Sequence, residues 1–148
     1  MVAVSAWWIG RVIQPRDASQ RAVRDLITGL CRESLNSLAG VSDLINATCP
    51  QGGEAISQSV RGQIMHALTG FSNSLLTIEE SVNQCGISID AAVVPELKAA
   101  RDDLRSQISE PLVTAGAYDA TQIRQIHGTI LKTRLALIKL QLRVVKDF

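Results

Sequence analysis

Aromatic side chains are scarce in this sequence. They make up 3% of its 148 residues, although 46% of the residues are hydrophobic. Strand-rich proteins usually carry many aromatic and β-branched residues on their pleated surfaces. The core must therefore be built from Leu, Ile, Val and Ala, which recur at helical spacing along most of the chain. This combination predicts an all-α protein.

Segments that would insert the chain into a membrane or export it are also missing. No stretch reaches the ~18 uninterrupted apolar residues that cross a bilayer. The apolar start lacks a charged leader and a clear cleavage site. The three cysteines, Cys31, Cys49 and Cys85, fall too far apart along the expected helices to form a disulfide. An odd number of unpaired cysteines is typical of a reducing compartment, so we expect a cytoplasmic protein.

Neither sign of charge dominates the whole chain. The formal net charge of +1 gives no strong nucleic-acid signal. The basic residues are nevertheless concentrated at one end, because residues 119–148 hold six Lys or Arg against two Asp or Glu. The last helix is therefore expected to be the basic one.

The motifs of common enzyme classes are absent as well. The sequence has no phosphate-binding loop, no GxSxG, no HExxH and no dinucleotide fingerprint. A di-iron bundle needs Glu-x-x-His pairs, and neither histidine has a glutamate three residues before it. No His or Cys spacing suits zinc. We therefore expect no cofactor, no metal and no catalytic residue.

Four amphipathic segments are present. Their apolar residues recur three and four positions apart, and short connections separate them. The expected helices cover about 17–47, 54–84, 91–110 and 119–147. Short connections place consecutive helices antiparallel. The sequence predicts an all-α, up-and-down antiparallel four-helix bundle: one domain over residues 17–148, preceded by an apolar N-terminal segment at 1–16.

Two of the expected helix starts share nearly the same phrase, Asp17-Ala-Ser-Gln20 and Asp119-Ala-Thr-Gln122. In each, a carboxylate stands three residues before a Gln, and two such side chains can cap each other's backbone amides. Both phrases therefore predict the first turn of a helix. At another boundary, Pro111 is expected to kink or end the third helix.

His66 lies opposite the apolar stripe of the second expected helix, so we expect it to be exposed. Leu, Gly and Ser follow it at offsets of two, four and six residues. This pattern resembles the histidine phosphotransfer modules of bacterial and plant phosphorelays, which are four-helix bundles. The resemblance implies a phosphoryl group on His66, beside Thr69, Gly70 and Asn73. Thr69 stands where the family has a lysine, and an ordinary surface histidine is the alternative interpretation.

The fourth expected helix is apolar over more than half of its circumference. At the centre of that arc, one heptad position carries His127, Arg134 and Gln141. A buried Arg needs an acceptor or an anion, because an unpaired buried charge is costly. The three polar residues predict either a hydrogen-bond network inside the bundle or a helix shared with a partner, with Leu135 and Leu142 in the interface.

The N-terminal segment contains the pair Trp7 and Trp8. We expect it to pack against the bundle or a partner, in preference to a membrane interface, where Trp rings favour the headgroup level. Together, these observations predict a non-catalytic interaction module that binds a protein partner, or itself as an oligomer, through the fourth helix and the Trp segment. The alternatives are phosphoryl transfer at His66 and carriage of an apolar anionic ligand held by Arg134.

Overall fold

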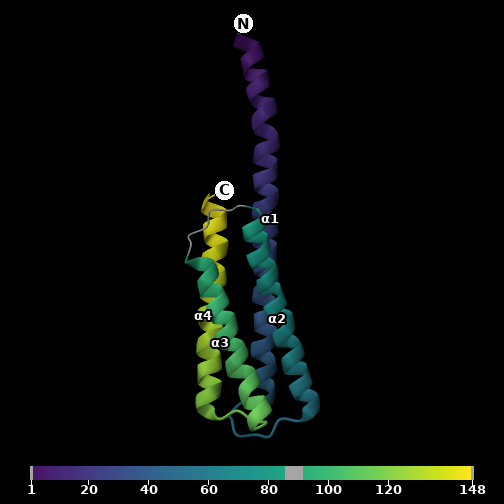
Figure 1. Ribbon diagram of the computed structural model, residues 1–148, viewed down its shortest axis with the longest axis vertical. Coiled ribbons are helices and arrows are strands. Elements are labelled where there is room, and N and C mark those ends of the chain that lie inside the picture. The colour runs from purple at the N-terminus through teal and green to yellow at the C-terminus, as the bar shows by residue number, and fades with distance from the viewer. Residues whose placement is uncertain (1, 86–91, 148) are drawn as a thin grey trace.

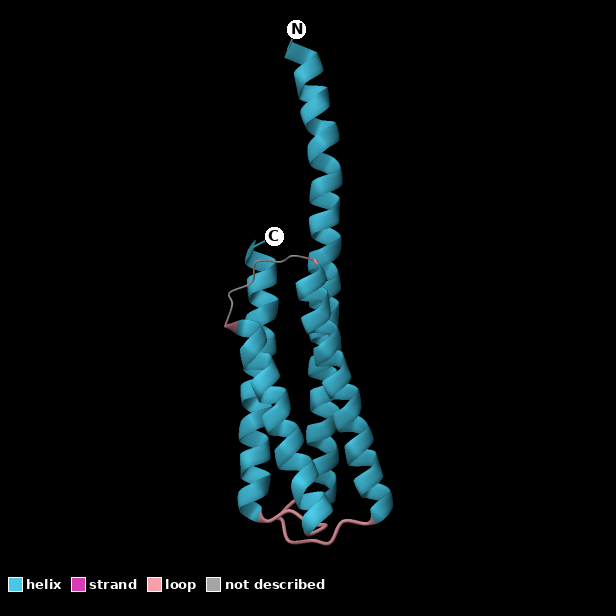
Figure 2. Cartoon of the chain, in the orientation of Figure 1, coloured by secondary structure: helices cyan, strands magenta, loops and turns pink. Residues whose placement is uncertain are grey.

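Apolar residues spaced three and four apart place four helices around one core in the computed structural model (Figure 1). The structure describes the backbone of residues 2–85 and 92–147, and the side-chain surroundings of residues 18–85 and 92–146. The helices are α1 (Val2–Thr48), α2 (Gln58–Gln84), α3 (Val93–Thr114) and α4 (Ala120–Asp147). The described residues contain no strand (Figure 2), and the predicted four-helix bundle is confirmed.

The helices form a ring in which each packs against two neighbours. The contacting pairs are α1 with α2, α2 with α3, α3 with α4, and α4 with α1. Across the described residues, the backbones of the diagonal pairs do not come close together. Phe71, Leu104 and Leu137 are fully buried from three different helices. The core is therefore aliphatic, as the composition predicts, with Phe71 among its few aromatic members.

Two connections meet at one end of the bundle and join its two helical hairpins. The Gly53 N–H donates to the Tyr118 carbonyl at 2.7 Å, and the Ile56 N–H donates to the Gly116 carbonyl at 3.0 Å. Tyr118 is fully buried, and its hydroxyl donates to the Ile108 carbonyl at 2.7 Å. Ile56, Gly116 and Tyr118 are buried, and these bonds give their backbone groups partners.

The two similar Asp-to-Gln phrases have different outcomes. The Asp119 N–H donates to Gln122 Oε1 at 2.9 Å, and the Gln122 N–H donates to Asp119 Oδ1 at 2.7 Å, so the predicted reciprocal cap is confirmed. The prediction at Asp17 is wrong, because α1 runs unbroken from Val2 through this residue. Once a helix exists, extending it gains one hydrogen bond for each residue ordered. A capping phrase therefore does not by itself interrupt a helix.

Two other helix boundaries also differ from the predicted ones. α2 begins at Gln58 rather than near residue 54, and Ser57 caps it by accepting from the Val60 N–H at 3.4 Å. α3 continues through Pro111 to Thr114 instead of ending at 110. The Ala115 N–H donates to the Pro111 carbonyl at 3.0 Å, so the helix ends one turn after the proline. Pro111 thus lies in the last turn, and its missing N–H removes one helical bond, the one to the carbonyl of residue 107.

α1 is longer than its neighbours. Its 47 residues span about 70 Å, against about 40 Å for the 27 residues of α2. The N-terminal part of α1 extends beyond the ends of the other three helices (Figure 1). Among the described residues, none of the four helices combines the length and hydropathy needed to cross a membrane.

Candidate interaction surface on α4

The inward face of α4 presents a buried residue at every third or fourth position. These residues are Ile123, Ile126, Ile130, Thr133, Leu137, Leu140 and Val144. Thr133 is the polar member of the row, and its hydroxyl donates to the Thr129 carbonyl at 2.8 Å. The Thr129 hydroxyl donates in turn to Gln107 Oε1 on α3 at 2.7 Å. The polar groups at the centre of α4 are therefore satisfied within the bundle.

The outward face of α4 carries a second apolar row. We call it the outer seam, and it consists of Leu131, Leu135, Ile138, Leu142 and Val145, which alternate four and three residues apart. The exposed fractions of these residues run from 37% at Ile138 to 64% at Leu142. At about 100° per residue, the outer seam is centred about 130° from the row of buried residues. α4 is thus apolar on two separate sides.

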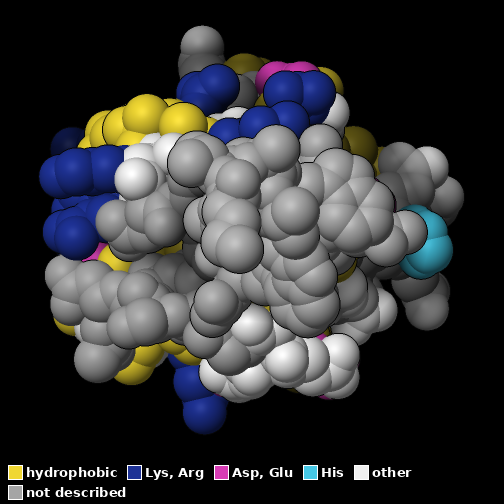
Figure 3. All heavy atoms as spheres, turned by 90° about the horizontal axis from the view of Figure 1, so that it is seen from above, with side chains coloured by type: hydrophobic (Ala, Val, Ile, Leu, Met, Phe, Trp, Pro, Cys, Tyr) yellow, Lys and Arg dark blue, Asp and Glu magenta, His cyan; other side chains and the backbone are white. Residues whose placement is uncertain are grey.

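Such a row is peculiar to α4 among the described helices. Only three further large apolar side chains are exposed in the described part of the chain: Leu26 on α1, Leu76 on α2 and Val113 on α3. Isolated apolar residues are common on protein surfaces, whereas contiguous apolar patches mark interaction sites. In the view down the bundle axis, hydrophobic side chains gather at the rim beside Lys and Arg side chains (Figure 3).

The predicted burial of the polar residues His127, Arg134 and Gln141 is wrong. Arg134 is exposed, and the other two are half-buried. Their heptad position lies between the buried face and the outer seam. The two rows together form one wide apolar arc, and the middle of that arc falls on these three residues, although neither row is centred there. Thr133 occupies the central buried position instead. The spacing of residues 126, 130, 133 and 137 as a row of their own is the sequence signal that indicates the burial of Thr133.

The groove beside Arg134 gives no support to an anionic ligand. Arg134 lines a groove of about 200 Å³ between α1 and α4 together with Asp43 and the apolar Leu35, Leu38 and Ile130. A carboxylate at the same groove would repel the acid group of such a ligand. Arg134 therefore belongs to the rim of the outer seam rather than to an enclosed pocket.

Basic residues border the outer seam on both edges. Lys132, Lys139 and Lys146 share one heptad position along one edge, and Arg134 lies on the other. All four are exposed, and α4 contains no acidic residue before Asp147. Within the described part of the chain, Lys132 and Lys139 form no ion pair. The outer seam is therefore an apolar row between two positively charged edges.

A groove of about 410 Å³ runs along the lysine edge, between α3 and α4. Its α4 wall includes Leu135 of the outer seam and the lysines Lys132 and Lys139. Glu96 and Asp103 line the groove from α3, and alanines from both helices also line it. The charge therefore changes sign across the groove, from the lysines on α4 to the carboxylates on α3.

His66 is exposed on α2, as predicted. Gly62 and Gly70 lie one turn to either side of it, and nothing stands within 4 Å of a Cβ built on either glycine. The two other residues implied by the phosphotransfer resemblance, Thr69 and Asn73, line a neighbouring groove of about 280 Å³ between α2 and α3, and His66 is not among that groove's lining residues. The structure therefore brings Thr69 and Asn73 together at a groove whose rim His66 does not form.

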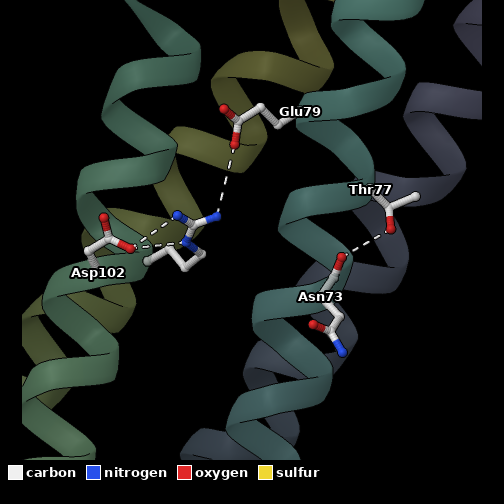
Figure 4. Close-up of polar contacts among 5 residues, drawn as sticks. Asn73, Thr77, Glu79 and Asp102 are labelled. Atoms are coloured by element: carbon white, nitrogen blue, oxygen red, sulfur yellow. Dashed lines mark hydrogen bonds and ion pairs between the residues drawn. The ribbon is translucent and has the colours of Figure 1, made fainter.

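Arg101, which lines this α2–α3 groove, forms ion pairs with two carboxylates. Arg101 of α3 contacts Asp102 Oδ1 at 3.1 Å and Glu79 Oε2 of α2 at 3.9 Å (Figure 4). Thr77 donates to the Asn73 carbonyl at 3.0 Å on the facing helix. Since both carboxylates engage Arg101, its charge is largely neutralised locally. It therefore serves to join α2 to α3.

The three cysteines are free, as their spacing predicts. Cys31 and Cys49 are buried and Cys85 is exposed. Burial raises the pKa of the Cys31 thiol to about 12. Burial, and then the nearby Glu54 carboxylate, raises the pKa of Cys49. Both buried thiols are thus protonated at neutral pH and unreactive as nucleophiles.

Trp7 and Trp8 lie on the α1 backbone, but their side chains fall outside the described residues. Among the described side chains, no group of three or more His, Cys, Asp or Glu is placed to hold a metal ion. Comparison of the chain with protein-family models, with curated proteins and with solved structures finds no match.

Proposed function

We propose that this chain is a non-catalytic interaction module that binds an amphipathic helix of a partner protein along the outer seam of α4. The observation that carries the proposal is the row of five exposed apolar side chains at alternating spacings of four and three. This spacing matches the a and d positions at which two helices pack side by side. From Leu131 to Val145 the row is about 21 Å long, or two heptads.

The energy available from this row is suited to reversible binding. Full burial of a Leu, Ile or Val side chain contributes about 1.5 to 3 kcal/mol, so five roughly half-exposed side chains contribute about 4 to 8 kcal/mol. The partner's own apolar residues add to this sum, and the lost freedom of two associating molecules opposes it. The proposal is therefore a transient contact that forms and dissociates, with no permanent subunit interface.

The test uses a fluorescently labelled synthetic peptide with Leu at its a and d positions, in three versions with Glu, Gln or Lys at the flanking positions. At least one version is expected to bind the protein, as measured by fluorescence anisotropy. The double variant Leu135→Gln, Leu142→Gln should weaken that binding at least about tenfold, because two desolvated apolar contacts are lost.

The matched control is Leu26→Gln, because Leu26 is also a half-exposed leucine but lies on α1. It should leave peptide binding unchanged, and thermal unfolding should show that both variants are folded. Light scattering of the unbound protein completes the experiment. A monomer that binds none of the three peptides would contradict the proposal, as would binding that is indifferent to the double variant.

A second candidate is phosphoryl transfer at His66. The exposure of the imidazole and the open space at Gly62 and Gly70 support it, since a donor protein could approach the ring. An imidazole nitrogen would attack the phosphorus of acetyl phosphate, forming a phosphoramidate and releasing acetate. Acid-labile labelling should then disappear in His66→Gln and persist in His127→Gln. Absence of label, or label retained in His66→Gln, would exclude this candidate.

A further inference from the structure

We infer that the helix bound on the outer seam carries acidic residues along both of its flanks and that it is not α4 of a second copy of this chain. The inference rests on the proposed function and adds the chemistry of the partner. In paired helices, the residues that border the apolar row determine which partner and which orientation are accepted. The residues that border the outer seam therefore indicate which kind of helix it accepts.

Both borders are positively charged. Lys132, Lys139 and Lys146 repeat every seven residues along one edge, so their charges follow the whole length of the row. Arg134 stands on the opposite edge, and both half-buried members of that edge, His127 and Gln141, lack negative charge. Glutamates at the flanking positions of a bound helix would meet these cations directly and gain charge-assisted contacts.

A second copy of α4 does not fit this surface. If two copies met in parallel, the lysine edge of one would face the Arg134 edge of the other. If they met antiparallel, the lysine edge would face the lysine edge. Neither orientation supplies a carboxylate, because the described part of α4 from residue 120 to 146 contains none. Like charges at flanking positions reject a partner.

Neighbouring helices limit the width of the positive strip. Glu96 and Asp103 line the α3 wall of the groove beyond the lysines, and Asp43 shares the α1-side groove with Arg134. A broad anionic surface such as a bilayer would approach these three carboxylates together with the lysines. The cations of α4 lie between the outer seam and these neighbouring helices, so a single helix along the outer seam would meet the cations before the carboxylates. The charge arrangement therefore favours a narrow acidic helix over an anionic membrane.

The experiment compares the Glu-flanked and Lys-flanked peptides on the full chain by fluorescence anisotropy. The Glu-flanked peptide is expected to bind at least about tenfold more tightly, and added salt should reduce the difference. The triple variant Lys132→Glu, Lys139→Glu, Lys146→Glu should reverse the preference. Lys98→Glu, which changes an exposed lysine of α3, is the matched control and should leave the preference as it is.

Each other outcome decides against the inference. Equal binding of both peptides, abolished by the Leu135→Gln, Leu142→Gln double variant, would overturn the acidic partner while retaining the docking surface. A dimer that the same double variant dissolves would identify a second copy as the occupant. Binding to vesicles of phosphatidylcholine with phosphatidylserine, without binding to either peptide, would identify a membrane. A monomer that binds neither peptide nor vesicle would overturn the proposed function as well.

Discussion

Gly116 has a backbone conformation and surroundings that favour glycine at this position. It has a φ of +66°, and a Cβ at this position would collide with the guanidinium of Arg61. That guanidinium cannot move away freely, because Arg61 Nε donates to the Ile56 carbonyl at 2.9 Å. The Ile56 N–H bonds the Gly116 carbonyl at 3.0 Å, so all three residues belong to the joined loops.

Gly116→Ala should therefore lower the free energy of unfolding by at least about 1 to 2 kcal/mol, the cost of a side chain in a left-handed conformation. Gly40→Ala is the control, since Gly40 lies in α1 with nothing within 4 Å of an added Cβ. It should raise the same quantity by about 0.5 to 1 kcal/mol. Urea unfolding of both variants checks the pair, and changes of the same sign would contradict the assignment.

Cys31 predicts a loss of stability at alkaline pH. Its ordinary pKa of 9.0 applies in the unfolded chain, and burial raises the folded-state pKa to about 12. Between these values the unfolded chain has released a proton that the folded chain keeps. Stability is therefore full below pH 9 and falls as pH rises toward 12, by up to about 1.4 kcal/mol per pH unit.

The check is the free energy of unfolding at about pH 8 and about pH 10 in the wild type and in Cys31→Ala. The alanine variant should be less stable at both pH values, because it leaves a cavity, but its decline with pH should be shallower. Burial also raises the pKa of Tyr118, with a smaller contribution from Cys49, so some decline should remain. Equal slopes in both proteins would refute the role of Cys31.

The contribution of the Asp119 cap to the start of α4 can be measured by mutation. Asp119→Ala removes the acceptor of the Gln122 N–H and should lower the free energy of unfolding by about 1 kcal/mol. Asp17→Ala changes the same phrase within an unbroken helix, where no helix start needs a cap, and should have little effect. Chemical denaturation distinguishes them. A comparable loss at Asp17 would place a helix start there after all.

In α4, sequence periodicity predicts the helix but not which of its residues are buried. That this helix is apolar on more than one side was evident from its residues, and Leu135 and Leu142 are indeed exposed. The predicted burial of His127, Arg134 and Gln141 is wrong, because these residues lie midway between two apolar rows. Their burial depends on where α1 and α3 lie around α4, which no local pattern specifies.

The whole molecule combines a four-helix bundle with a protruding helix. Removing residues 1–17 should change the free energy of unfolding by less than about 1 kcal/mol, because a helix without neighbours contributes little stability. A deletion through residue 31 also removes the buried Ile27 and Cys31 and should destabilise the bundle strongly. Urea unfolding of both truncated chains checks this. A large loss in the shorter deletion would show that the N-terminal segment supports the bundle.

The sequence by itself determined the helical class, the number of helices and the cap at Asp119. These features depend on neighbours within one or two helical turns, and local hydrogen bonds and apolar spacing encode them. Only the tertiary structure decided which apolar row of α4 faces the core, and with it the exposure of the outer seam and of Arg134. Both rows satisfy helical spacing equally well. Only the positions of α1 and α3 bury one row and leave the other in solvent.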